Sequence, residues 1–181
     1  MGKLTYTMLT SADGYAVGPD GSFDWATPTP EVHRHANGLE RAVSREILGA
    51  RMWEVMSWWE DFAPDADAPQ DEMTDAAVEF AEIWRAIPKT VFSHATGNPF
   101  DAEVVRELVE ASEGIVSISG PTIAAVALRE GLVDEVAHYV VPVVVGGGTP
   151  WWPLGLEARL ELLEEQNFDE GWIYLRYRVL R

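Results

Sequence analysis

Four segments of the chain join the end of an apolar run to a glycine or a small polar residue: residues 11–14, 48–51, 117–122 and 145–150. Glycine takes positive φ without steric cost and lets a backbone approach a ligand closely. A helix that begins just beyond such a turn offers unpaired N–H groups to a phosphate, and Gly120-Pro121-Thr122 meets this requirement best. The pattern predicts a phosphate-bearing ligand of unspecified type, because neither Rossmann nor Walker glycine spacing is present.

The run Gly146, Gly147 and Gly148 is the most unusual of these features. Three consecutive glycines lose much conformational entropy on folding, so a close contact or an unusual backbone dihedral must require them. Trp151 and Trp152 follow, and their flat rings suit either a ligand pocket or a contact with a partner subunit. We therefore expect residues 140–153 to line a binding site.

Two aspartates are candidates for acid–base chemistry. Asp13 lies between a predicted strand and Gly14, where its carboxyl group could serve as an acid, although Asp-Gly pairs are equally common in simple turns. Asp24, beside Trp25 in a long loop rich in glycine and proline, is the second candidate. His138 lies in a valine-rich strand, where we expect a histidine with its hydrogen bonds satisfied rather than a ligand.

Composition excludes several classes of function. The 181 residues include no cysteine, which removes thiol catalysis, disulfides and zinc–sulfur sites and suits a reducing, cytoplasmic location. A formal charge of -17, with only 13 Lys and Arg residues, disfavours nucleic acid and anionic lipid as partners. No apolar stretch is long enough to span a membrane. His33 and His35 do not have the i, i+4 spacing of a helical metal site, and we expect no metal.

The elements that must position these residues alternate along the chain, which we interpret as a single domain over residues 1–181. Strands are predicted at residues 3–11, 89–93, 114–119, 135–145, 159–168 and 172–180, and helices at residues 31–45, 52–59, 74–87, 101–111 and 121–129. Alternating strands and helices indicate an α/β fold with a largely parallel sheet covered on both faces. The last two strands are predicted to form an antiparallel hairpin. Right-handed crossovers then bring the strand-end loops to one rim.

Six stretches, taken in order and with their spacing, resemble the dihydrofolate-reductase-like family that includes the riboflavin-biosynthesis reductase C-terminal domain. They are residues 10–14, 47–54, 91–93, 119–122, 131–135 and 142–150. The most distinctive are Gly-Leu-Val-Asp-Glu at 131–135 and the Pro-Val-Val-Val-Gly-Gly-Gly-Thr-Pro segment. The resemblance implies a three-layer fold with a central mixed sheet and an NADPH-dependent reductase, commonly a homodimer. Its substrate would be a pterin-like or ribosylaminopyrimidine-like compound with a C=N or C=O group.

The same resemblance implies roles for particular residues. The cofactor phosphates and ribose would contact Gly49, Arg51, Met52 and Trp53, and the adenosine ribose with its 2′-phosphate would contact Ser93 and His94. The pyrophosphate would contact Ser119, Gly120, Pro121 and Thr122. The nicotinamide side would contact Gly146, Gly147 and Gly148. Asp13 would lie near the substrate, with Asp24, Trp25, Trp151 and Trp152 as further candidate substrate residues.

One departure from the family pattern bears on activity. Many members carry Gly-Arg-x-Thr where this chain has Gly49-Ala50-Arg51-Met52, so an arginine and a hydroxyl that bind phosphate are absent from their usual positions. A non-catalytic nucleotide-binding or assembly protein on the same scaffold is therefore the alternative to a reductase. A hydrolase is a third class, but no Ser/His/Asp elbow supports it.

Overall fold

The chain folds around one seven-stranded sheet with the strand order β4-β3-β5-β1-β6-β9-β8. The computed structural model describes residues 2–65 and 71–180. The strands are β1 (Lys3–Ser11), β3 (Val43–Gly49), β4 (Lys89–Phe92), β5 (Ile115–Ser119), β6 (Glu135–Val141), β8 (Arg159–Asn167) and β9 (Ile173–Leu180). The first five of these run parallel to one another, whereas β9 is antiparallel to both β6 and β8. The predicted mixed, mostly parallel sheet and the antiparallel C-terminal hairpin are therefore confirmed.

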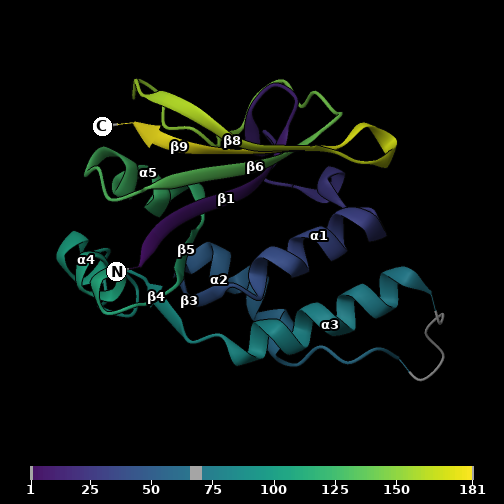
Figure 1. Ribbon diagram of the computed structural model, residues 1–181, viewed down its shortest axis with the longest axis horizontal. Helices are drawn as coiled ribbons and strands as arrows, with labels where there is room; N and C mark the ends of the chain where they lie inside the picture. The colour runs from purple at the N-terminus through teal and green to yellow at the C-terminus, as the bar shows by residue number, and fades with distance from the viewer. Residues whose placement is uncertain (1, 66–70, 181) are drawn as a thin grey trace.

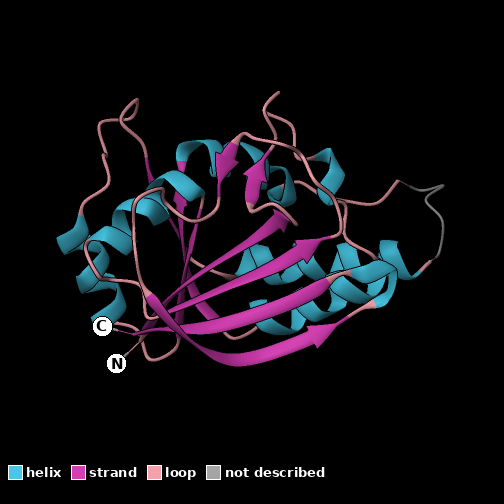
Figure 2. Cartoon of the chain, turned by 90° about the horizontal axis from the view of Figure 1, so that it is seen from above, coloured by secondary structure: helices cyan, strands magenta, loops and turns pink. Residues whose placement is uncertain are grey.

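Helices cover both faces of this sheet, which twists strongly along its length (Figure 2). They are α1 (Pro30–Glu40), α2 (Ala50–Met56), α3 (Glu72–Ala86), α4 (Ala102–Glu110) and α5 (Pro121–Arg129). Val105 of α4 and Ile123 of α5 pack in one core cluster with Tyr6 and Val136 of the sheet. Val32 of α1 packs in a second cluster, built on alternate residues of the same strands. In the part of the chain described, no helix is both long and apolar enough to cross a membrane.

Helices α1 and α3 lie side by side beneath β1 and β6 (Figure 1). A buried amide joins them: Asn37 donates from its Nδ2 atom to the Ala76 carbonyl oxygen at 2.9 Å and to Glu79 Oε2 at 2.6 Å. Side chains cap the first turns of both, because Thr29 accepts from the Val32 N–H group and Asp71 accepts from the Thr74 N–H group. The composition of residues 63–71, with three Ala, two Pro and three Asp, predicts a solvated loop, of which residues 66–70 lie outside the described residues.

The structure differs from the predicted element boundaries in two places. The helix expected over 31–45 ends at Glu40, because residues 43–49 form β3 between β4 and β5 and tertiary pairing overrides their helical composition. The strand expected over 135–145 ends at Val141, where Pro142, which has no N–H group, interrupts the ladder. A two-stranded sheet that the sequence did not indicate pairs β2 (Tyr15–Val17) with β7 (Thr149–Pro150), seen as two short strands at the top of Figure 2.

One row of register partners crosses the whole sheet with polar side chains on the face that α1 covers. In order from β4 to β8, the row is Lys89, Glu46, Ser117, Thr5, Glu135, Arg178 and Glu161. Its four central members are buried, with Glu46 only 2% exposed and Glu135 5% exposed. Glu135 is held in two ion pairs, to Lys3 at 2.7 Å and to Arg176 at 3.1 Å. Such burial is tolerated only where a carboxylate has partners.

Replacing Glu135 with Gln keeps the shape of the side chain but removes the charge that Lys3 and Arg176 neutralise. We expect the free energy of unfolding to fall by about 1–3 kcal/mol, because hydrogen bonds to charged groups contribute that much. Urea denaturation at neutral pH measures the change. Glu161→Gln, in the same row but half-exposed and paired with Arg178, is the matched control and should change stability by less than about 1 kcal/mol. Equal losses in both variants would contradict this account of the row.

Candidate functional site

The parallel pairing brings the glycine segments to one edge of the sheet. Strands β1, β3, β5 and β6 end at Ser11, Gly49, Ser119 and Val141, and parallel strands end at a common edge. Ser93 directly follows β4 at the same edge. Loops after strands at such an edge are where ligands of open α/β sheets bind. The rim formed by these five strand ends is the candidate functional site.

Helix α5 begins at this rim without a side-chain cap. Its N-cap is Gly120, whose φ of 108° lies where residues with a side chain are strained. A Cβ atom at Gly120 would lie 3.4 Å from the Met52 Cβ atom and 3.9 Å from the Gly49 nitrogen. Three residues that the resemblance assigned to one cofactor are therefore in contact. The first-turn N–H groups of α5 face the space beyond them, with the positive end of the helix dipole.

The three-glycine segment is held by the β1 loop. Asp13 accepts hydrogen bonds from the Gly146 N–H group at 2.8 Å and from the Val145 N–H group at 3.2 Å. Gly146, Gly147 and Gly148 all have positive φ, at 77°, 151° and 117°. A Cβ atom at Gly148 would lie 2.0 Å from the Val17 carbonyl oxygen, so no other residue fits there. Unusual dihedrals and one close backbone approach thus explain the three glycines.

Asp13 itself is exposed, and its surroundings favour the ionised form. The Ser11 hydroxyl is the largest cause that lowers its pKa below the ordinary value, followed by the backbone N–H groups of Gly146 and Val145. A carboxylate held in this way is a poor proton donor at neutral pH. These hydrogen bonds make Asp13 an anchor of the glycine segment, and its role as an acid stays a prediction.

The two tryptophans after the glycine segment pack onto the sheet. The Trp151 ring stacks on His138 at 4.3 Å between centroids, and the Trp151 carbonyl oxygen accepts a hydrogen bond from the Tyr6 hydroxyl at 3.1 Å. Trp152 donates from its Nε1 atom to the Leu156 carbonyl oxygen at 2.8 Å. Both side chains are partly buried against the cluster that α4 and α5 also cover. Trp151 therefore fixes the segment 140–153 to β1 and β6.

The four predicted substrate residues are not brought together. Trp25 packs against the cluster under α1, on the opposite face of β1 and β6 from Trp151 and Trp152. Asp24 is exposed at the start of a short 3-10 helix, Asp24–Ala26. The sheet separates the pairs because alternate residues of a strand point to opposite faces.

The remaining predicted cofactor residues lie at or beside the rim with different exposure. His94 and Arg51 are exposed, whereas Met52 and Trp53 are partly buried on α2. Ser93 is buried, and its backbone pairs with Asn98 through two hydrogen bonds, of 2.6 and 3.0 Å, that close a tight loop. Pro121 and Thr122 form the first turn of α5.

Two residues near the rim, Ser11 and Glu46, escaped sequence reasoning. The Ser11 hydroxyl accepts from the Tyr15 N–H group at 3.0 Å and also supports Asp13. His138, expected from the sequence to be a strand histidine with its hydrogen bonds satisfied, interacts through Nδ1 with the Thr10 hydroxyl at 3.1 Å beneath Trp151. Glu46 lies 3.5 Å from the Ser119 hydroxyl. The one sequence feature that could have indicated Glu46 is its charge at the start of the otherwise apolar run 46–49.

Two surface hollows lie away from this rim. One, of about 770 Å³, includes Lys3, Leu132 and Asp134, near the start of β1 and β6 and so at the opposite edge of the sheet. The other, of about 350 Å³, is lined by Glu40, Val43, Ile83 and neighbours. Within residues 2–65 and 71–180, no group of three or more His, Asp or Glu side chains could hold a metal ion. Neither hollow contains a residue predicted to bind cofactor or substrate.

Comparison with known proteins bears on the identity of this rim. A family model described as the RibD C-terminal domain matches residues 101–174, which include β5, α5, β6 and the glycine segment. Residues 101–174 are thus similar to the RibD C-terminal domain. The resemblance predicted from the sequence is confirmed by this match.

Individual relatives are distant. The riboflavin biosynthesis protein RibD of Mycobacterium tuberculosis is 27% identical over 156 residues, which cover 80% of this chain and 43% of that protein. The chain therefore spans less than half the length of this RibD. A putative riboflavin biosynthesis protein from Shewanella sp. PV-4 has a solved structure that superimposes with a TM-score of 0.66 at 18% identity, covering 100% of both chains.

The fold extends to dihydrofolate reductase. The enzyme of Enterococcus faecalis, solved as a complex with NADP(H), superimposes with a TM-score of 0.58 at 12% identity and covers 99% of this chain and 97% of that one. At such identities the likeness shows the fold alone. The predicted dihydrofolate-reductase-like α/β fold is confirmed.

The buried ring of His138 predicts acid sensitivity. Burial lowers its pKa from 6.5 to about 4, so it folds as the neutral form. The stability that this neutrality provides is complete above the unfolded value of 6.5 and is lost as pH falls from there toward 4, because the unfolded chain takes up the proton first. We expect a loss of about 2 kcal/mol between about pH 7 and about pH 5, at 1.4 kcal/mol per pKa unit.

Urea denaturation at the two pH values measures this loss. His138→Phe keeps a ring against Trp151 but cannot titrate, so its loss should be smaller by most of that amount. The residual pH dependence then reports other groups, including His35, whose pKa is also lowered by burial. An unchanged dependence in His138→Phe would rule out His138 as the cause.

Proposed function

We propose that the chain is an NADPH-dependent reductase of a small heterocyclic or carbonyl substrate, pterin-like or ribosylaminopyrimidine-like. The observation that carries this proposal is the uncapped start of α5 at Gly120, in contact with Gly49 and Met52 on the same rim as the glycine segment. RibD, a relative in sequence, is a riboflavin biosynthesis protein by name, and dihydrofolate reductase, which shares the fold, is a reductase solved as a complex with NADP(H).

The contrast among helix N-termini supports a phosphate at α5. Helices α1, α3 and α4 each have a side-chain cap, from Thr29, Asp71 and Asp101. Helices α2 and α5, which begin at the rim after Gly49 and Gly120, have none, and Gly120 leaves the first N–H groups of α5 open to a ligand. We assign the pyrophosphate to residues Ser119–Thr122, the phosphates and ribose to Gly49 and residues 51–53, and the adenosine ribose to Ser93 and His94.

The glycine segment fits the nicotinamide side of the same cofactor. Its positive-φ backbone carries no side chains, so a flat ring can lie directly against it. NADPH, when bound, supplies the hydride, and the protein supplies orientation and exclusion of water. Asp13 acts here by fixing Val145 and Gly146, and Trp151 by fixing the next residues to the sheet. The substrate would then lie beside the segment, near Trp151 and Trp152 or on the Asp24 and Trp25 side of the sheet.

A non-catalytic nucleotide-binding protein is the second candidate, and two observations favour it. Ala50 and Met52 replace the residues that bind phosphate in many members of the family, and Arg51 is exposed on α2. Asp13 is already engaged with backbone N–H groups, which leaves no acid among the predicted site residues at the glycine segment. Turnover separates the candidates: NADPH oxidation with any of a panel of pterins, aminopyrimidines and carbonyl compounds supports the reductase, whereas saturable binding without oxidation supports the alternative.

A cytoplasmic homodimer completes the proposal. The resemblance implies the dimer, the lack of cysteine suits the location, and the edge strand β8 exposes Leu160 and Leu162, with 37% and 49% of their surface open to solvent. Sedimentation equilibrium measures the oligomeric state.

Substitution at the start of α5 tests the cofactor site. Gly120→Ala places a methyl group at φ 108° against Met52, and we expect NADPH affinity to fall at least about tenfold, or 1.4 kcal/mol. Titration of tryptophan fluorescence with NADPH measures it. Gly131→Ala is the matched control, because Gly131 follows the other end of α5, has positive φ at 66° and has open space around it. Equal affinities in the two variants, or no saturable binding by the wild-type chain, would count against the proposal.

Two substitutions at Asp13 separate an anchor from an acid. Asp13→Asn keeps an oxygen that can accept from Gly146 N–H, whereas Asp13→Ala removes it. If Asp13 anchors the glycine segment, Asp13→Asn should retain most of the NADPH affinity and turnover. Asp13→Ala should raise KM for NADPH more than it lowers kcat. Steady-state kinetics measures both constants. An equal loss of kcat in Asp13→Asn and Asp13→Ala, with an unchanged KM for NADPH, would instead support Asp13 as the acid.

A further inference from the structure

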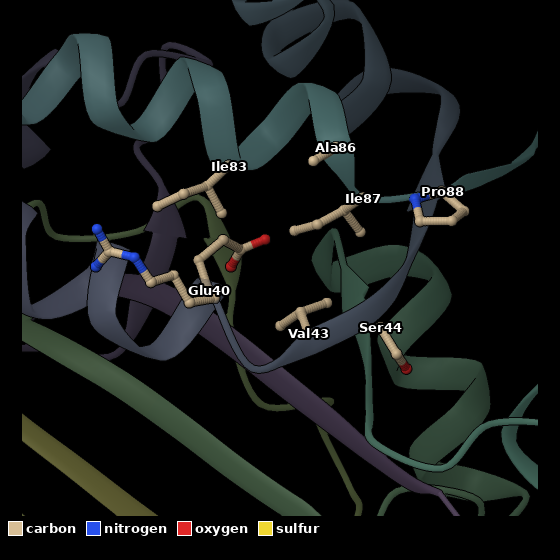
Figure 3. Close-up of a pocket in the computed structure, with 8 residues that line it drawn as sticks. Glu40, Val43, Ser44, Ile83, Ala86, Ile87 and Pro88 are labelled. Atoms are coloured by element: carbon tan, nitrogen blue, oxygen red, sulfur yellow. The ribbon is translucent and has the colours of Figure 1, made fainter.

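A pair of glutamates lies within the fold, behind the rim. Glu46 of β3 is 2% exposed, and its carboxyl group is hydrogen-bonded to that of Glu40, the last residue of α1. Figure 3 shows the Glu40 carboxyl group pointing toward Ile83 and Ile87, which line the same hollow. Two carboxyl groups in contact, Glu46 buried and Glu40 partly buried, cannot both be ionised at low cost.

The charges that face this pair are few. Lys89 of β4 is the register partner of Glu46, but it forms an ion pair with Glu60 at 3.1 Å and also donates to the Trp84 carbonyl oxygen. Arg41, next to Glu40, also lines the hollow but forms an ion pair with Glu79, and the lining residues from α3 and its end, Ile83, Ala86 and Ile87, carry no charge. From β5, the Ser117 and Ser119 hydroxyls face Glu46. Lys89 therefore compensates one negative charge of the pair only in part.

Both carboxyl groups consequently hold a proton more tightly than usual. Burial is the largest cause that raises the pKa of Glu46 well above 4.5, and the nearby Glu40 raises it further. Burial also raises the pKa of Glu40, although its hydrogen bond to Glu46 and the charge of Lys89 oppose the rise. Glu46 is the more deeply buried of the two, so a negative charge is more costly there than on Glu40.

We propose that Glu40 and Glu46 share one proton at neutral pH and that protonated Glu46 is a positioning residue for the Ser119–Gly120 turn that begins α5. Glu46 Oε2 lies 3.5 Å from the Ser119 hydroxyl, and Gly120 is the next residue. Loss of the proton adds a charge behind the turn and repels an anion at the helix start. The link to the cofactor rests on the function proposed above, whereas the shared proton does not.

The sign of the pH dependence follows from the raised values. A glutamate that is neutral when folded stabilises the fold fully below its unfolded pKa of 4.5, and this contribution is lost as pH rises through the folded value. Across that window, the unfolding equilibrium constant should rise about tenfold per pH unit for each proton released. Anion affinity at α5 should weaken over the upper part of the same window.

Glu46→Gln is the decisive variant, because its amide reproduces the protonated acid: Nε2 can donate to Glu40 while Oε1 accepts from the serines. We expect Glu46→Gln to lose about one proton of the pH dependence of unfolding, measured by urea denaturation from about pH 5 to about pH 9. Glu40→Gln, the second variant measured in the same way, should lose part of it, because burial still raises the pKa of Glu46 when the charge of Glu40 is gone. Glu135→Gln, buried in the same row but held in ion pairs, is the matched control and should keep it.

Infrared spectroscopy detects the protonated carboxyl group itself, which a purely structural role of Glu46 would not require. The carboxylic C=O band of a buried acid should be present in the wild-type chain at neutral pH and absent in Glu46→Gln, and Glu135→Gln should retain it. NADPH affinity should weaken with rising pH in the wild-type chain and stay level in Glu46→Gln, with Glu46→Ala weakened throughout.

Two results would overturn the proposal. A wild-type pH dependence of unfolding that persists in Glu46→Gln and Glu40→Gln, or the absence of a carboxylic band in the wild-type chain, excludes the shared proton. NADPH affinity that weakens identically with pH in wild type and Glu46→Gln excludes the positioning role. Failure of every variant to bind NADPH instead refutes the proposed function, while the unfolding and infrared measurements still decide the shared proton.

Discussion

The parallel pairing of β1 with β5 on one side and β6 on the other is the constraint on which the rest of the structure depends. It places the ends of five strands at one edge, and so places the start of α5 and the glycine segment on one rim. Register matters as much as direction. A slip of one residue in β1 would move Tyr6 from the core to the other face and Thr5 into its place. The position of the site is therefore set first by strand pairing in the sheet and only then by the conformations of the loops.

The two faces of that sheet differ in polarity and in what they support. The face under α4 and α5 is apolar and supports Trp151 and the start of α5 through Ile123 and its neighbours. The face under α1 carries a polar row in which Glu46 and Glu135 are equally buried but oppositely compensated, one by a shared proton and the other by two cations. Buried carboxyl groups are costly as bare charges, and the chain offsets this cost by protonation at Glu46 and by ion pairing at Glu135.

Much of the fold could be predicted because local signals agree with it. Asp101 caps α4, Pro121 begins α5, and residues 169–171 turn the terminal hairpin, all as the sequence indicates. Predictions failed where tertiary pairing prevailed over local composition. Residues 43–45 look helical but are taken into β3, and β2 has too few residues to give a pattern and exists only because β7 pairs with it.

The sequence by itself determined the α/β class, the glycine segments at strand ends and the resemblance to the RibD C-terminal domain, because periodicity, caps and glycine placement are local properties of the chain. Only the tertiary structure decided what those residues do. It assigned Asp13 to the backbone of residues 145–146, set Trp25 and Trp151 on opposite faces, and joined Glu40 to Glu46. Each of these depends on which side of a strand a residue faces and on which distant segment lies opposite, and no local pattern contains that information.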